Sequence, residues 1–215
     1  RAFDGPSFSN EPPSFDNQAG EDAFGFLKAT YDQGCIWIGR QSEPFYYFAN
    51  RYALMYAGAL DQIPIQTGWM DQAGNQDEWV SMGFPGSAGE TMLIDGPGLM
   101  ISNGNPEAEL AAWLFAKYLL EPEAQAELVQ RTFTLPVRNS SRSFLGDFEA
   151  AYPQWVQAAD RLDSASFVPV SDYWGIAQWV LQDAIVRMFN SEASEQGAIL
   201  EQLDAMILEM SGVAP

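Results

Sequence analysis

The sequence predicts an α/β fold in which helices dominate. Of its 215 residues, 47% are apolar, which is enough to form a sizeable core. Two long amphipathic helices are expected near the C-terminus, and short apolar segments bounded by glycine and proline, typical of strands, lie in the middle. At about 150 residues per domain, this length corresponds to one large domain or two small ones.

The first fifty residues predict a loop and two helices. Residues 1–20 are rich in Pro, Ser, Asn and Asp, as loops are. Asp16 or Asn17 can cap a helix over about 19–31, whose apolar residues recur at the spacing of one helical face. A second helix is expected over 43–50, where a proline is tolerated in the first turn.

Strand candidates follow, separated by a polar stretch. The polar stretch 65–79 is expected to be a loop. The strand candidates are a buried segment at 52–58, "WVSMGFPG" at 79–86, and "TMLIDGPGLMIS" at 91–102, which reads as strand, break and strand.

The second half of the chain is mainly helical. Asn105 and Pro106 mark the start of a helix, since proline is favoured at the first helical position. The apolar stripe of this helix is expected to be buried and consists of Leu110, Ala111, Leu114, Phe115 and Tyr118. Further helices are expected over 122–130, over 144–162 with a break at Pro153, over 173–190 and over 194–210, with an extended segment at 133–141.

The charge of the chain restricts its partners. Asp and Glu number 29 against 10 Lys and Arg, a formal net charge of −19. Such a surface repels phosphate backbones and anionic lipid, so nucleic acid is a poor candidate partner and no membrane contact is expected of this segment. The sequence also holds no run of about 18 apolar residues, so no part of it is expected to span a membrane.

The sequence contains no His and a single Cys, Cys35. Triads that use His, zinc sites with His ligands and internal disulfides are therefore excluded. Cys35 is expected to be a buried structural thiol, because its neighbours give no sign of thiolate activation.

Gly96-Pro97-Gly98 has three interpretations: a phosphate cradle, a hinge between lobes, or a plain turn. A cradle requires a lysine or a helix that starts at once, and here the helix starts some eight residues later. Glycine and proline inside a strand pattern mark a bend or a close backbone approach. The hinge is favoured over the plain turn.

Tyr173 and Trp174 open the helix at 173–190. Aromatic residues at helical spacing usually pack in the core, yet a Trp at a helix N-terminus can offer a flat face to a ligand. Loop carboxylates are a further group, and a glycosidase pair among them is an alternative, although most such acids are solvated surface charge. They are Asp61, Asp71, Asp77, Glu78, Asp95 and Asp172.

The order of these motifs resembles the C-terminal half of extracellular solute-binding proteins of the sugar-binding, maltose-binding-protein-like type. The matching segments run across nearly the whole chain: "FDNQAGEDAFGFLKATYDQG", "YFANRYALMYAG", "VSMGFPG", "DGPGLMIS", "NPEAELAAWLFAKYLLEPEAQAEL", "LPVRNSS" and "YWGIAQWVLQDAI". The family has a longer N-terminal part without a counterpart here, so the chain is expected to be one segment of a longer protein.

The resemblance implies an incomplete type II periplasmic-binding-protein fold, in which ligand lies between two α/β lobes. Residues 1–94 would belong to the second lobe, 95–140 would cross into the first, and 141–215 would return to the second. Gly96 and Gly98 would then lie at a lobe crossing. The apolar stripe entering the incomplete first lobe would face water, which predicts dimerisation, a second chain or poor stability.

The resemblance also implies a ligand site. Trp174 corresponds to the family's sugar-stacking aromatic residue, with Tyr173 beside it, and Asp95 or Asp172 would accept hydroxyl hydrogen bonds. Gly96 and Gly98 would let backbone N–H groups approach the ligand, and Gly58 matches a glycine of the family's "N-G-P-W" turn. This sequence departs from the family at Leu60 and Pro97, where aromatic residues are expected, so a linear maltodextrin is a doubtful ligand.

The function implied is capture of a saccharide or polyol by lobe closure, without chemistry, metal or cofactor, and delivery to the permease subunits of an ABC transporter. The location implied is extracytoplasmic, in the periplasm or anchored at the cell surface as a lipoprotein, with the signal or anchor outside this segment. The alternatives are a carbohydrate-active hydrolase using two loop carboxylates and a receptor subunit that presents ligand to a sensor.

Overall fold

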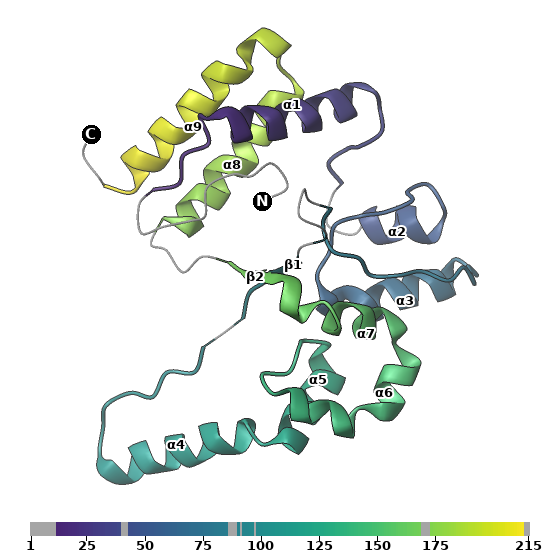
Figure 1. Cartoon of the computed structure of the whole chain (residues 1–215), viewed down its shortest axis with the longest axis vertical. Helices are drawn as coiled ribbons and strands as arrows, with labels where there is room; N and C mark the ends of the chain where they lie inside the picture. Colours follow the sequence, from purple (N-terminus) through teal and green to yellow (C-terminus); the bar gives the residue numbers. More distant parts are fainter. Residues whose placement is uncertain are drawn as a thin grey trace. The chain divides into compact units, whose positions relative to one another are not determined.

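The computed structural model describes residues 12–39, 43–85, 90, 92–96, 98–168 and 173–212. Its helices and strands, in chain order (Figure 1), are α1 (Gln18–Asp32), α2 (Glu43–Ala49), α3 (Ile63–Gln72), β1 (Met92–Ile94), α4 (Pro106–Leu119), α5 (Pro122–Thr132), α6 (Gly146–Ala151), α7 (Pro153–Ala159), β2 (Ala165–Phe167), α8 (Trp174–Phe189) and α9 (Gln196–Met210). Short 3-10 helices lie at Leu60–Gln62, Asn139–Phe144, Leu162–Ser164 and Ala193–Glu195.

The chain folds into two compact units. Unit 1 comprises Arg1–Ile38, Phe84–Leu93 and Ser166–Pro215, and unit 2 comprises Gly39–Gly83 and Ile94–Ala165. These boundaries differ from the segments 1–94, 95–140 and 141–215 expected for the two lobes. The assignment of those segments to lobes stays a prediction.

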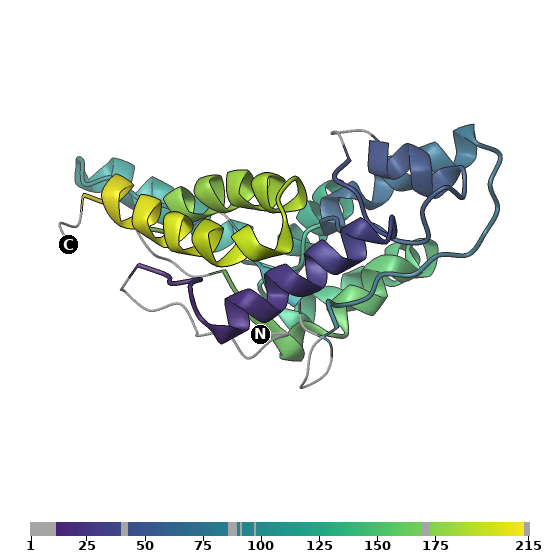
Figure 2. The same cartoon turned by 90° about the horizontal axis from the view of Figure 1, so that it is seen from above.

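Unit 1 is a bundle of α1, α8 and α9, which lie together in both views (Figures 1 and 2). Asn17 begins α1, because its side chain accepts a hydrogen bond from the Gly20 amide at 3.0 Å, as the sequence predicts for an N-cap. The Tyr31 ring at the end of α1 stacks on Phe189 of α8, with centroids 4.3 Å apart. The buried core residues are Phe24, Ala177, Val180, Ala184, Met188, Phe189, Ile199, Leu200, Leu203 and Ile207.

Asp204 of α9 ties the segment before α1 to this bundle. Its carboxylate accepts hydrogen bonds from the Ser14 hydroxyl at 2.6 Å and from the backbone amides of Phe15 at 2.7 Å and Asp16 at 3.1 Å. Phe15 in turn packs against the core of unit 1. Hydrogen bonds to a charged acceptor are stronger than neutral ones, so this carboxylate fixes where the chain enters α1.

Unit 2 has a core of its own, built from α3, α5, α6 and α7. The fully buried Trp155 of α7 lies within it and donates its indole N–H to the Thr134 carbonyl at 3.2 Å. Pro153 begins α7, as predicted from the break it introduces between two helices. The buried residues of this core are Ile63, Ala126, Val129, Phe133, Leu145, Phe148 and Trp155.

The expected strand at 52–58 is wrong. Tyr52, Leu54 and Met55 are exposed, at 65%, 91% and 74%, and this segment has no ladder partner within the described residues. The amides of Tyr52 and Ala53 bond instead to the Tyr47 carbonyl at the end of α2. A strand sequence without a neighbouring strand leaves its backbone groups to local turns or water.

The expected strand at 79–86 is also wrong over its described part, and its backbone hydrogen bonds go to side chains. Gln154 of α7 donates to the Trp79 carbonyl at 3.1 Å, and the Ser81 amide donates to Gln157 at 2.9 Å. These two glutamines take the place of a neighbouring strand, and Phe84 alone forms an isolated bridge.

The strand–break–strand pattern at 91–102 is confirmed in its first half only. β1 pairs with β2 in a two-stranded sheet, the one sheet of the described residues, whereas Leu99, Met100 and Ile101 form no strand and are exposed. The sequence missed β2 because three residues of mixed type carry no clear alternation.

Residues 63–72 form α3, where a polar loop was expected. The pattern was misread because Gln66 occupies the buried face of this helix together with Ile63 and Met70. Gln66 is fully buried and its amide donates to the Phe45 carbonyl at 3.4 Å, so a polar residue behaves here as part of the core.

Two expectations about burial are wrong. Cys35 is exposed, not buried. The apolar stripe of α4 is exposed as well, although Asn105 caps this helix as predicted, accepting from the Ala108 amide at 2.8 Å. No residue of α4 is buried, which agrees with the expectation that an apolar stripe in this region faces water.

We predict that Asp204→Ala lowers the free energy of unfolding of unit 1 by about 1–3 kcal/mol, because three donors lose a charged acceptor. Glu201→Ala is the matched control: Glu201 is exposed on the same helix, and no hydrogen bond or ion pair to it is found within the described residues. Thermal denaturation of both variants measures the difference. Equal melting temperatures would show that this anchor contributes nothing.

Candidate functional site

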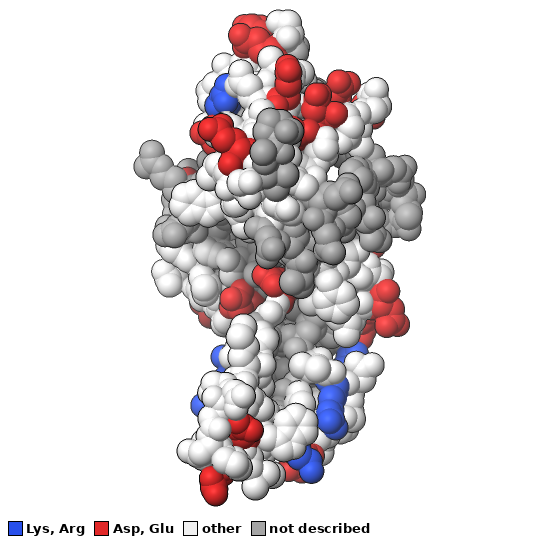
Figure 3. Space-filling model, turned by 90° about the vertical axis from the view of Figure 1, so that its left-hand side faces the viewer, with Lys and Arg blue, Asp and Glu red and all other residues white. Residues whose placement is uncertain are grey.

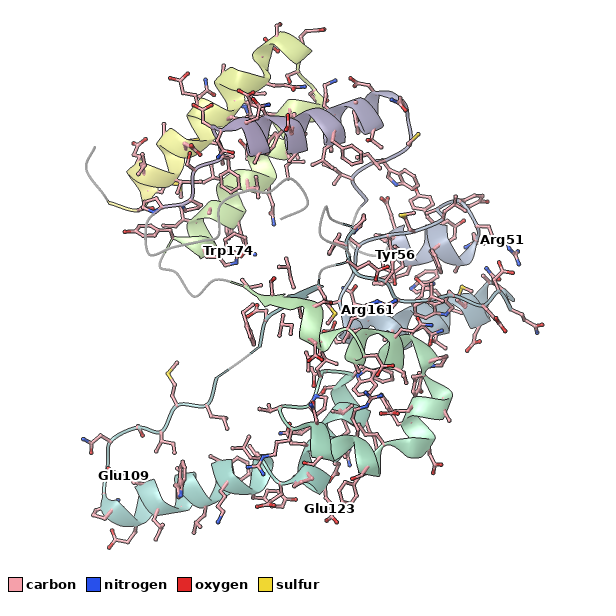
Figure 4. All side chains as sticks on the ribbon, viewed as in Figure 1. Arg51, Tyr56, Glu109, Glu123, Arg161 and Trp174 are labelled. Carbon is pink, nitrogen blue, oxygen red and sulfur yellow. The ribbon has the colours of Figure 1, made fainter. Side chains whose placement is uncertain are left out.

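Trp174 is the first residue of α8, and Tyr173 precedes it as the N-cap residue (Figure 4). The Tyr173 carbonyl accepts the Ala177 amide at 2.8 Å, the first hydrogen bond of the helix. Both side chains are half-buried, and Trp174 packs against the core of unit 1. The two sequence interpretations therefore both hold in part: the indole is anchored in the core and still reaches solvent.

The segment after β1 carries Asp95, Gly96 and Gly98. The Asp95 carboxylate accepts the Gly96 amide at 2.8 Å, so that amide is already engaged by its neighbour. A Cβ atom placed on Gly96 or Gly98 would meet nothing within 4 Å, and all three residues are exposed. The space beside both glycines is therefore open to another molecule, and their role at a ligand stays a prediction. Asp172 and Pro97 lie outside the described residues.

Gly58 has a steric role within unit 2. A Cβ atom there would lie 2.7 Å from Oε1 of Gln62 and 2.8 Å from Cε2 of Tyr56, closer than any real contact. The same Gln62 oxygen accepts the Ala59 amide at 3.1 Å and so fixes the turn into the next helix. The glycine is needed because two side chains converge on its backbone.

Tyr56 is a residue that the sequence interpretation missed. Its ring is half-buried, with edge contacts to Phe45 and Phe48 at centroid distances of 5.5 and 5.6 Å. Burial raises the pKa of its phenol to about 12, so the hydroxyl stays protonated at physiological pH. The only signal in the sequence was an aromatic residue two places before Gly58.

The structure shows the sequence-predicted site residues as separate local groups. Tyr173 and Trp174 belong to unit 1, whereas Asp95, Gly96, Gly98 and Gly58 belong to unit 2. Within unit 2, Asp95 lies beside Gly96, and Gly58 lies beside Tyr56. Each group is locally well defined, and their union in one site stays a prediction.

The loop acids do not include an evident acid catalyst. Asp77 forms a two-pronged ion pair with Arg51, with N–O distances of 2.7 and 3.0 Å, and Asn75 accepts from both the Arg51 side chain and the Asp77 amide. The hydrogen bond from Arg51 lowers the pKa of the Asp77 carboxyl, which keeps it ionised. Within the part of the chain that the structure describes, no group of His, Cys, Asp and Glu side chains could hold a metal ion.

A shallow depression of about 530 Å³ on unit 2 contains none of the residues predicted for the site. It is lined by Gln130, Ser143, Phe144, Gly146, Asp147 and Phe148. Phe148 belongs to the core of unit 2, so this hollow follows the turn into α6 and offers no aromatic face comparable to that of Trp174.

Comparison with known proteins decides the family. The model of the family described as bacterial extracellular solute-binding protein matches residues 2–160. This chain belongs to that family. No curated protein matches the chain. The family is one of binding proteins located outside the cytoplasm, which confirms the expected family and agrees with the expectation that the chain is not an enzyme.

A solved relative of the family confirms the fold class. The chain is similar to the cyclic α-maltosyl-1,6-maltose binding protein from Arthrobacter globiformis, with a TM-score of 0.72 and 18% identity. The match covers 96% of this chain and 52% of that one, so the chain spans about half the length of this relative. Within the described residues, no helix is both long and apolar enough to cross a membrane.

We predict that Gly58→Ala lowers the free energy of unfolding by about 1–2 kcal/mol, because the added methyl group displaces Tyr56 and Gln62. Gly96→Ala is the control, since its Cβ would meet open space, and it should change stability by less than about 0.5 kcal/mol. Urea denaturation of both variants makes the comparison. Equal midpoints would contradict a steric role for Gly58.

We further predict that Arg51→Gln raises the titration midpoint of the Asp77 carboxyl towards its ordinary pKa of 3.8, because the stabilising hydrogen bond is lost. Since the pKa is lowered in the folded chain, the pair contributes stability above the ordinary value, and that contribution is lost as the pH falls through the lowered pKa. Carbon-13 NMR of the carboxyl groups measures both midpoints. An unchanged midpoint would show that the pair does not persist in solution.

Proposed function

We propose that this chain forms part of a protein that binds a saccharide or polyol outside the cytoplasm and delivers it to the permease subunits of an ABC transporter. The observation that carries the proposal is the indole of Trp174. It stands at the first residue of α8, fixed by the core of unit 1 on one side and reaching solvent on the other.

The chemistry of this position suits a neutral sugar. The flat apolar face of an indole can pack against the C–H face of a pyranose ring, and Tyr173 adds a second aromatic side chain beside it. The ring hydroxyls need hydrogen-bond acceptors. Asp95, and Asp172 in the sequence, are carboxylates that would form strong hydrogen bonds with them.

The charge of the chain favours an uncharged ligand over an anionic one. Acidic side chains gather over the end of the molecule that carries α1, α8 and α9, where basic side chains are sparse (Figure 3). With a formal charge of −19, the chain repels phosphorylated sugars and attracts no polyanion. A neutral saccharide or polyol carries no such penalty.

The mechanism proposed is capture without chemistry. Ligand bridges two lobes, closure buries it, and the permease recognises the closed form. Micromolar capture corresponds to about −8 kcal/mol. A stacked indole and several hydroxyl hydrogen bonds can supply this free energy after the ordering costs are met. The related protein from Arthrobacter globiformis, named for binding a maltosyl-maltose, supports a saccharide as the ligand class.

The location proposed is the periplasm or the outer face of the cytoplasmic membrane, where a lipid anchor would hold the protein. Family membership supports an extracytoplasmic place. The ionised state of Asp77 gives no support to the alternative of a hydrolase with two loop carboxylates.

We predict that Trp174→Ala in the full-length protein weakens the binding of its saccharide or polyol ligand at least tenfold, because a stacking face is lost. Trp179→Ala is the matched control: Trp179 lies on the same helix, is 79% exposed and points about 140° away around the helix axis. Isothermal titration calorimetry over a panel of saccharides and polyols first identifies a ligand and then compares the variants.

Two results would contradict the proposal. In the first, no saccharide or polyol in the panel binds the wild-type protein. In the second, Trp174→Ala and Trp179→Ala bind the ligand as tightly as the wild type does, which would remove Trp174 from the site.

A further inference from the structure

We propose that α4 pairs antiparallel with α4 of a second copy of this chain. The helix has an apolar face that the described part of the chain leaves uncovered. Leu110, Trp113, Leu114 and Tyr118 recur at the spacing of one face, and each is 55–58% exposed. The proposal is independent of the ligand site, which lies elsewhere in the fold.

The size of this face exceeds that of an ordinary surface patch. A buried aromatic side chain contributes about 150–250 Å², so the exposed parts of Trp113, Tyr118 and the two leucines amount to roughly 400 Å² per copy. The largest apolar patch of a typical monomer is about 300–600 Å² in all, and Phe115, 60% exposed, adds to this one. Two such faces together bury roughly 800 Å² or more, which corresponds to a weak, reversible dimer.

The charges at the two ends of the face fit a second copy in the antiparallel direction. Glu107 lies in the first turn of α4 and Lys117 in the last, and both are exposed. At about 100° per residue the two lie about 80° apart around the helix, with Leu110 and Leu114 between them. They are about 15 Å apart along the axis, too far for an ion pair within one helix.

Pairing about a two-fold axis resolves this separation. When two α4 helices lie antiparallel and are centred near Trp113, Lys117 of each copy comes opposite Glu107 of the other. Neither side chain has an ion-pair partner within the described residues, so both are available. The antiparallel direction also sets the two helix dipoles in their favourable orientation. A two-fold axis makes the contact self-complementary and closed, so it ends at a dimer.

A helix face designed for a purely apolar core would not place Glu107 and Lys117 along its own line. In a packed interior each charge would need a partner there, because burying an unpaired charge is costly. At a two-fold contact the same residues fall at the rim, where they pair with each other and set the register. This distinction favours a second copy over an apolar core from other polypeptide.

The first experiment is sedimentation velocity on the 215-residue chain over a range of concentrations. We expect a reversible monomer–dimer equilibrium in the micromolar range. Leu114→Asp should abolish the dimer, because it places a charge in the middle of the face. Val186→Asp is the matched control, since Val186 is 47% exposed on α8 of unit 1 and should leave the dimer unchanged.

The second experiment is a charge-reversal cycle that removes no apolar surface. Lys117→Glu and Glu107→Lys should each weaken the dimer at least tenfold, because each brings like charges together across the two-fold axis. The double variant Lys117→Glu/Glu107→Lys should return to within about threefold of the wild type. Circular dichroism checks that all variants keep the same helix content, so a loss of fold is not mistaken for a loss of pairing.

Several outcomes would overturn the proposal. A chain that stays monomeric at all concentrations does so, as does a double variant no stronger than either single variant. A third such outcome concerns the full-length protein: if it is monomeric and hydrogen exchange shows α4 protected, polypeptide corresponding to the uncovered half of the Arthrobacter relative covers this face instead.

Discussion

The constraint on which this structure depends is that an apolar helix face or a strand edge needs another element to cover it. Unit 1 meets this requirement internally, because α1, α8 and α9 bury their apolar faces against one another. Unit 2 meets it only in part. Its core around Trp155 is closed, whereas 52–58, 98–102 and α4 expose apolar residues without a covering element in the described chain. A chain that spans about half of a related binding protein is expected to show this pattern.

This difference between the units decides how much of the fold the sequence could predict. Helices carry their signals locally: Asn17 caps α1, Asn105 with Pro106 begins α4, and Pro153 begins α7, each as expected. Strands carry no such local guarantee, because their hydrogen bonds come from a neighbour that the pattern does not identify. The apolar segments were located correctly at 52–58 and 79–86, yet local groups such as the Tyr47 carbonyl and the side chains of Gln154 and Gln157 satisfy their backbone instead.

The candidate site was predictable to the level of residues but not of contacts. Trp174 was found through a family pattern, and its half-burial depends on core residues that come from the other two helices of unit 1. The convergence of Tyr56 and Gln62 on Gly58 could not be seen, because it depends on how the turn before Leu60 folds. Cys35 was misjudged for a related reason: whether a short apolar side chain is covered depends on neighbours that lie elsewhere in the sequence.

The partial burial of Trp174 reconciles the core and ligand interpretations and gives the proposed site a physical advantage. Ordering a free side chain at a binding surface costs about 0.5–1.5 kcal/mol. An indole already fixed by the helix bundle has met much of that cost during folding, so more of its contact with a sugar ring appears as affinity. The neutral ligand proposed here also feels little of the acidic field of the chain, so affinity at this position depends on contact and shape. A rigid aromatic wall on a stable bundle is therefore the element of this chain best suited to recognising an uncharged solute.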